Sequence, residues 1–175
     1  MRFDLDSAGF TRYFPAHVNK AAVLKKIVER LTTDLEVYFK AARAAHFEAT
    51  HEQSKAENKY DTRGLEASYL ARGQSKQAAE LEQSLEQYRA LSVREFTAET
   101  PVDIGALVEL AVGRERAWYF LGPRAGGTEV SHGGHEITVI TPQSPIGQTL
   151  VGRRQGDTVR LTFGAKAEAK LVSVS

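Results

Sequence analysis

Residues 24–49 of this chain read LKKIVERLTTDLEVYFKAARAAHFEA, and residues 64–88 read GLEASYLARGQSKQAAELEQSLEQY. Both stretches repeat mostly apolar or small residues every seven positions, which is the pattern of a coiled-coil seam between two helices. The two lines of the first seam are Leu24, Leu31, Tyr38 and Ala45, and Val28, Leu35, Ala42 and Ala49. The two lines of the second seam are Ala67, Gln74, Leu81 and Tyr88, and Gly64, Ala71, Ala78 and Leu85. The sequence therefore predicts two long helices that pack on each other, one from about Lys20 to Thr50 and one from about Lys55 to Leu91.

The two predicted helices are expected to run antiparallel. The first seam begins with large residues and ends with small ones, and the second seam has the reverse order. Antiparallel pairing places Leu24 opposite Tyr88 and Ala45 opposite Ala67, with the reversal near Ala56. At about 1.5 Å per residue, the first arm up to residue 52 spans roughly 40 Å, which is longer than a small globular core requires. We therefore expect a helical hairpin that projects from the rest of the chain.

The predicted reversal, residues 52–61, reads EQSKAENKYD and is rich in acids. Ser54 and Glu57 have the spacing of a capping box, in which the Ser oxygen accepts a backbone N–H and the Glu reaches back to the cap. Asp61 fits the first turn of a helix, where an acid complements the helix dipole. Alternatively, Glu52, Glu57 and Asp61 are carboxylates at the end of a slim rod, and carboxylates are ligands that Mg²⁺ accepts. The structural and the functional interpretation of these acids both stay open at this point.

The composition limits the class of protein. The 175 residues include 23 basic and 22 acidic side chains, and the formal net charge of +1 argues against bulk electrostatic binding to nucleic acid. The chain has no Cys, which excludes disulfides and Cys-based zinc sites. The N-terminus is broken by acids, and no apolar run approaches the length of a membrane span. We expect a soluble cytoplasmic protein without a signal peptide and without a membrane partner.

The chain changes character after residue 92. Residues 1–18 are predicted to form an N-terminal arm, residues 19–92 the coiled-coil hairpin, and residues 93–102 a linker. From residue 103 to 175, β-branched runs alternate with glycine turns, which predicts a mostly antiparallel sheet. Its five predicted strands are 106–112, 117–121, 136–141, 157–163 and 167–174. One short helix is expected at 144–151, where a Ser cap precedes a Pro at the first helical position. The predicted fold class is therefore α+β.

Ordered motifs in the C-terminal half resemble a known family. They are Ile104-Gly-Ala-Leu-Val-Glu-Leu, Tyr119-Phe-Leu-Gly, Ile137-Thr-Val, Ser144-Pro-Ile-Gly and Leu150-Val-Gly-Arg-Arg-Gln-Gly-Asp-Thr-Val. In order and spacing they are similar to the C-terminal domain of the Gre-type (GreA/GreB-like) transcript cleavage factors of bacterial RNA polymerase. The tip, Ser54-Lys-Ala-Glu57-Asn58-Lys-Tyr60, is similar to the Ser-Glu-Asn-x-x-Tyr motif of that family. The resemblance covers roughly residue 20 to the end.

This resemblance implies a function. The C-terminal domain would be FKBP-like and would dock at the rim of the secondary channel of the polymerase, with Ser144, Pro145 and Ile146 as the docking loop. The hairpin would enter that channel, where tip acids help the active site of the polymerase to hold a second Mg²⁺ and to cleave the 3′ end of backtracked RNA. The protein would then be an accessory factor rather than an enzyme, with no cofactor or stably bound metal of its own, and it would meet DNA only through the polymerase complex.

The tip departs from the family pattern at one position. Of the two family acids, the second falls on Glu57 and the first falls on Ser54, whose hydroxyl is not a charged metal ligand. Glu52 or Asp61 could supply the missing carboxylate, with Asn58 and Tyr60 as tip neighbours. Alternatively, the protein is a cleavage-deficient regulator or inhibitor that occupies the same channel. A third interpretation, a coiled-coil adaptor unrelated to polymerase, would use the seam to bind another helix.

Three other motifs have structural interpretations. His132-Gly-Gly-His135 carries two imidazoles, but a zinc site needs four ligands, so a hairpin turn is the better interpretation. Gly122-Pro-Arg-Ala-Gly-Gly lacks the Gly-Lys-Ser/Thr ending of a phosphate loop and is expected to be a loop between strands. Four basic residues on the hairpin fit either a solvated face or contacts with RNA or the channel wall: Arg43, Arg63, Arg72 and Lys76.

Overall fold

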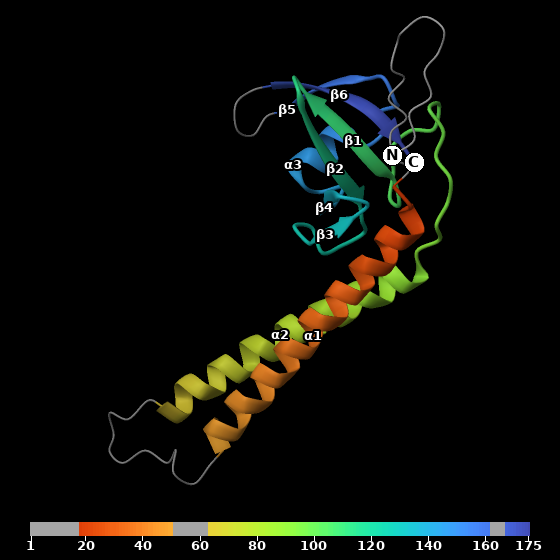
Figure 1. The fold of residues 1–175 in the computed structure, drawn as a ribbon. Coiled ribbons are helices and arrows are strands. Elements are labelled where there is room, and N and C mark those ends of the chain that lie inside the picture. Colours follow the sequence, from red (N-terminus) through yellow and green to blue (C-terminus); the bar gives the residue numbers. More distant parts are fainter. Residues whose placement is uncertain (1–17, 51–62, 162–166) are drawn as a thin grey trace, which may run out of the picture.

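The computed structural model describes residues 18–50, 63–161 and 167–175. Its two long helices, α1 (Lys20–Thr50) and α2 (Arg63–Ala90), form an antiparallel hairpin that extends away from a β-sheet (Figure 1). α1 begins where the Asn19 side chain accepts a hydrogen bond from the backbone N–H of Ala22, at 3.1 Å. With 31 residues, α1 is about 46 Å long. The predicted boundaries of the first helix are confirmed, whereas the predicted start of the second helix lies outside the described residues.

The second half of the chain forms a six-stranded sheet with the strand order β3-β4-β2-β1-β6-β5. The strands are β1 (Leu107–Val112), β2 (Glu115–Leu121), β3 (Glu129–His132), β4 (His135–Ile140), β5 (Thr158–Leu161) and β6 (Ala167–Val174). The short helix α3 (Pro145–Leu150) lies between β4 and β5 in the chain. The predicted α+β class, with a helical hairpin followed by a mostly antiparallel sheet and one short helix, is confirmed.

One strand of the sheet was not predicted from the sequence. The strand β3 was missed because Val130 is its one buried apolar residue, which is too weak a signal for a strand. It pairs with β4 across the turn at Gly133 and Gly134, both of which have positive φ. Because the chain makes this extra β-hairpin after β2, β4 returns in the same direction as β2, and the two strands pair parallel. The loop between strands that was expected at residues 122–127 is confirmed, as is the glycine turn between His132 and His135.

Each face of the sheet buries a separate set of apolar side chains, because successive residues of a strand point to opposite faces. On one face, α3 contributes Leu150 to a core that also contains Val108 and Leu121. On the other face, the hairpin packs against Leu107 and Phe120 and their neighbours. The second core therefore joins the hairpin to the sheet.

This second core corrects the predicted seam. Near the sheet, Val23 and Ile27 are fully buried, while the seam residues Leu24 and Val28 are only partly buried. The reason is that α1 faces two partners here, α2 and the sheet, so its buried stripe is turned toward the sheet. Farther out, Ala45 is buried as the seam predicts, because α2 is its partner there.

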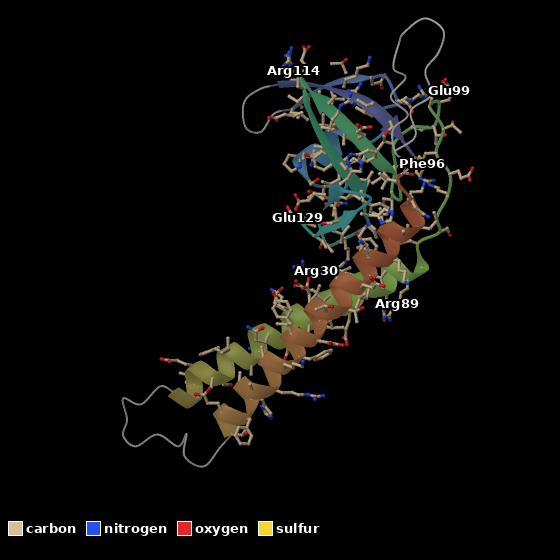
Figure 2. All side chains as sticks on the ribbon, in the orientation of Figure 1. Arg30, Arg89, Phe96, Glu99, Arg114 and Glu129 are labelled. Atoms are coloured by element: carbon tan, nitrogen blue, oxygen red, sulfur yellow. The ribbon has the colours of Figure 1, made fainter. Side chains whose placement is uncertain are left out.

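Residues 93–102 form no helix or strand, but they are held against the sheet domain. Phe96 is buried in the core that contains α3, and the ammonium group of Lys20 lies 4.6 Å from the centre of its ring (Figure 2). The backbone N–H of Val102 donates to the carbonyl of Arg153 at 2.7 Å. The chain between hairpin and sheet is therefore anchored to the sheet domain at Phe96 and Val102.

Within the described ranges, the helices include none that is both long enough and apolar enough to span a membrane.

Candidate functional site: the outer hairpin and the adjoining loops

The predicted tip connects the two helix ends that lie farthest from the sheet. α1 ends at Thr50 and α2 begins at Arg63. The tip residues of the sequence analysis all fall between them and lie outside the described residues: Glu52, Ser54, Glu57, Asn58, Tyr60 and Asp61. Figure 1 shows both helix ends at the extremity of the molecule opposite the sheet. The chain thus leaves α1 and enters α2 at the end of the hairpin that is far from the sheet.

The outer half of the hairpin is slim. Beyond Leu35 and Leu81, no residue of the helices belongs to the core shared with the sheet. The 16 residues from Leu35 to Thr50 extend over about 22 Å, and in the described part of the chain α2 is the element that packs along them. The buried contacts there are made by small side chains such as Ala45 and Ala67, at 4% and 6% exposure. Small seam residues let the helices approach closely, which keeps the rod narrow.

Large apolar side chains stand on the outside of this outer half. Among the described residues, all but two of the strongly exposed large apolar side chains lie here: Val37, Phe39, Phe47, Leu65, Tyr69 and Leu70. Tyr69 and Phe47 are each 66% exposed. These residues occupy heptad positions outside the seam and are spread over several sides of the rod. The sequence analysis missed them, although large apolar residues off the seam were visible in the sequence. Their concentration on one part of the fold makes the outer hairpin a candidate interaction surface.

A groove between the outer helices has a cationic and hydroxyl-rich lining. It has a volume of about 650 Å³, and the residues that line it include His46, Ser68, Arg72 and Ser75. No acidic side chain lines it within the described part of the chain. Of the basic residues singled out in the sequence, the groove thus contains Arg72, whereas Lys76 instead pairs with Glu80 at 3.9 Å.

The predicted docking loop lies at the start of α3, and its three residues have different environments. The Ser144 hydroxyl caps α3 by accepting from the backbone N–H of Gly147 at 3.1 Å, and it donates to the carbonyl of Thr141 at 2.7 Å. Ile146 packs partly buried against the sheet core. Pro145 is exposed, as are Gln143 and Gln148. Ser144 and Ile146 therefore shape the loop, and Pro145 is the member of the three that a partner can contact.

A crevice separates this loop from the hairpin. It has a volume of about 590 Å³, and it lies between α2 and the loops at 123–126 and 141–143. Gln77, Glu80 and Ser84 line it from the helix, and Arg124 and Gln143 line it from the loops. The segment just before the predicted docking loop and the adjacent part of α2 thus border one polar depression.

The two imidazoles of the glycine turn do not belong to a metal cluster. The ring of His135 lies against the ring of Trp118 in a tilted arrangement, with the ring centres 5.1 Å apart and an angle of 42° between the planes. In the described ranges, no group of three or more His, Asp or Glu residues is placed to hold a metal ion.

Comparisons with known proteins give a limited result. No family model matches the sequence, and no curated protein matches it. Several solved structures are similar to the chain, including three structures of Gfh1. The GreA factor homologue Gfh1 of Thermus thermophilus has 24% identity and a TM-score of 0.36, over 85% of this chain and 94% of its own. Gfh1 of Thermus aquaticus has 24% identity and a TM-score of 0.37, over 83% and 92%. A further structure of the transcription factor Gfh1 has 26% identity and a TM-score of 0.37, over 86% and 94%.

Proposed function

We propose that this protein is a Gre-type accessory factor that binds bacterial RNA polymerase, inserts its helical hairpin into the secondary channel and acts on the active site of the polymerase. The observation that carries the proposal is the position of the Ser54-Lys-Ala-Glu57-Asn58-Lys-Tyr60 motif, between the outer ends of α1 and α2. A motif that resembles the acidic tip of these factors thus stands, in the chain, between the outer ends of two projecting helices. The ordered motifs of the sheet domain add independent support.

The surface of the rod suits a partner that surrounds it. A helix that is apolar on one face packs against one partner, and a helix that is apolar on several sides is enclosed. Val37, Phe39, Leu65 and Tyr69 are spread over several sides of the outer hairpin. A flat binding surface would leave some of them in water. A channel wall would cover them together, and it would also face the cationic groove that contains Arg72.

The proposed action at the tip uses the carboxylate of Glu57. In a site with two metal ions, a carboxylate supplied from outside stabilises the weakly held ion that activates the attacking water. Because Ser54 has no charge to contribute, a second carboxylate would come from Asp61 or Glu52. The polymerase would supply the catalytic residues and the first Mg²⁺, and the protein would supply the missing ligands.

The test is RNA cleavage in a deliberately backtracked elongation complex with Mg²⁺ and increasing amounts of the protein. We expect the transcript to shorten from its 3′ end faster than without the protein. Glu57→Ala should abolish the stimulation while binding to the polymerase persists. Glu82→Ala is a matched control, because Glu82 is an exposed acid of α2 far from the tip. Unchanged cleavage by Glu57→Ala would remove the role assigned to this residue.

Ser54 favours a second candidate function, a regulator that occupies the channel without stimulating cleavage. The variant Ser54→Glu separates the two, because it restores an acid at the position where the family has one. If the unaltered protein binds and inhibits transcription without shortening RNA, and Ser54→Glu gains cleavage, the regulator is correct. If the protein fails to bind purified polymerase, both candidates fail and a coiled-coil adaptor becomes the better interpretation.

Docking can be tested apart from the tip. Pro145→Ala should weaken binding to the polymerase, because Pro145 is the exposed residue of the predicted docking loop. Thr158→Ala is a control on the exposed surface of the edge strand β5. Equal binding by both variants would remove the docking role from this loop.

A further inference from the structure

One side chain of α2 is locked into the sheet domain. Tyr88 is 1% exposed, and its ring lies 6.4 Å from the ring of Phe120 in β2. Its hydroxyl donates a hydrogen bond of 2.8 Å to the backbone carbonyl of Arg124, in the loop between β2 and β3. Burial also raises the pKa of the hydroxyl, so Tyr88 stays a neutral donor. The sequence assigned Tyr88 to the seam with α1, and the structure adds this contact with the sheet domain.

The space that Tyr88 occupies depends on a glycine. A Cβ atom at Gly122 would lie 1.9 Å from the Tyr88 hydroxyl oxygen and 2.9 Å from the carbon that bears it. The φ of Gly122 lies outside the left-handed region, so other residues could adopt its backbone conformation. Glycine is therefore needed at position 122 for space rather than for backbone freedom.

Two hollows flank the loop whose Arg124 carbonyl accepts the hydrogen bond from Tyr88. The crevice of about 590 Å³ lies on one side of the loop, and a second groove of about 380 Å³, lined by Asp34, Val37 and Thr128, lies on the other. Both hollows are also lined by Gln77, Leu81 and Ala125. Beyond Leu81, continuous packing does not hold the rod against the sheet domain. The direction of the rod must then be held by the contacts at its base.

We infer that Tyr88 and Gly122 form a joint that sets the direction of the hairpin relative to the sheet domain, with Tyr88 as a positioning residue. α1 contributes a second tie, because the ammonium group of Lys26 donates to the carbonyl of Ser131 in β3. Besides the apolar core that both helices share with the sheet, each helix thus makes a side-chain hydrogen bond to the β2–β3–β4 part of the sheet domain. The inference concerns the free protein. The functional consequence of the joint rests on the proposed function, because a hairpin already held in one direction loses less conformational entropy when it enters a channel.

The absence of Cys makes the direction of the rod measurable. Ser75→Cys on the hairpin and Val151→Cys after α3 provide two exposed sites for spin labels. Pulsed electron spin resonance then gives the distribution of distances between the two labels. Ser75 lies 13 residues from Tyr88, about 20 Å along the helix, so a swing of about 10° moves its label by about 3 Å.

We expect a single narrow distribution for the labelled protein. Gly122→Ala should shift or broaden it, because the methyl group displaces the Tyr88 hydroxyl. Gly73→Ala is the matched control, since a Cβ at Gly73 meets no atom within 4 Å. Tyr88→Phe should broaden the distribution by removing the hydrogen bond to Arg124. In the Tyr88→Phe background, Gly122→Ala should change the distance distribution less, because the Tyr88 hydroxyl oxygen, the atom closest to the added methyl group, is absent.

Circular dichroism of every variant separates a changed direction from a loss of folding. If the Gly122→Ala protein does not fold, the distance distribution of the Tyr88→Phe protein tests whether Tyr88 sets the direction of the hairpin. A folded Tyr88→Phe protein with an unchanged distribution would overturn the inference, and so would a folded Gly122→Ala protein that behaves like Gly73→Ala. The measurement needs no polymerase. A failure to bind polymerase would therefore refute the proposed function, but it would not contradict the inference that Tyr88 and Gly122 set the direction of the hairpin.

Discussion

Three valines of α1 offer a test of how the hairpin is held. Val23 is fully buried, Val28 is a partly buried seam residue, and Val37 is 59% exposed. Val23 and Val37 occupy the same heptad position two heptads apart, so a coiled coil alone would expose both. Val→Ala makes the same chemical change at each site. Differences in the free energy of unfolding among the three variants therefore reflect how deeply each valine is buried.

The expected losses follow from the apolar groups removed. Val→Ala deletes the equivalent of two methylene groups, at about 0.8 kcal/mol each when fully buried. With the cavity that remains, Val23→Ala should lower the free energy of unfolding by about 2–3 kcal/mol. Val28→Ala should cost about half as much, in proportion to its partial burial. Val37→Ala should stay within about 0.5 kcal/mol of zero, since Ala is also the better helix former.

Urea unfolding followed by far-UV circular dichroism measures these differences, and thermal unfolding gives a second readout. For a chain of this size, about 2–4 °C of Tm correspond to 1 kcal/mol, so Val23→Ala should lower Tm by about 4–12 °C. A larger loss for Val28→Ala than for Val23→Ala would refute the reasoning. It would mean that the seam between the helices, and not the contact of α1 with the sheet, dominates at the base of the hairpin.

Three further outcomes are expected. The Arg94 guanidinium, 2.8 Å from Asp103, holds the pKa of that carboxyl below its ordinary value of 3.8 by hydrogen bonding. Because the folded-state pKa is lowered, the pair stabilises the fold above pH 3.8 and loses this effect as the pH falls through the lowered pKa. Both side chains are more than half exposed, so Asp103→Asn should cost no more than about 0.5 kcal/mol at neutral pH and nothing in strong acid, measured by urea unfolding at both pH values. Gly73→Ala should raise the free energy of unfolding by about 0.5–1 kcal/mol, because the site is an exposed helix interior with open space around it; a lower urea midpoint would contradict this. Ser144→Ala should cost about 1 kcal/mol through loss of the α3 cap, visible as a fall in Tm of about 2–4 °C, and an unchanged Tm would show that the cap does not matter.

Much of the architecture could be predicted from local patterns. The heptad repeat from Leu24 to Ala49 predicted α1, because a seam of regular period accompanies a helix, and the predicted ends at about Lys20 and Thr50 agree with the structure. The cap at Ser144 and the Pro after it predicted α3, since both act on the backbone within one turn. The glycine turn after His132 was likewise predicted from residues adjacent in the chain.

Other features depend on residues that are distant in the sequence. The strand β3 has a single buried apolar residue and exists because β4 offers it a partner. For the candidate site, the sequence marked the acids of residues 52–61 and the loop at Ser144 to Ile146, and these remain predictions of function. The exposed apolar residues of the outer hairpin were readable as large residues off the seam, yet their significance depends on where the sheet stops covering the rod.

The sequence by itself determined that this protein has a long helical hairpin with an acidic reversal, followed by a mostly antiparallel sheet, because periodicity, caps and turns are local properties of the chain. Only the tertiary structure decided which side of the hairpin meets the sheet. Val23 and Ile27 are buried there, and Tyr88 fits beside Gly122, because strands that come much later in the chain cover them. A seven-residue repeat records the contact between two helices and contains no information about a third partner.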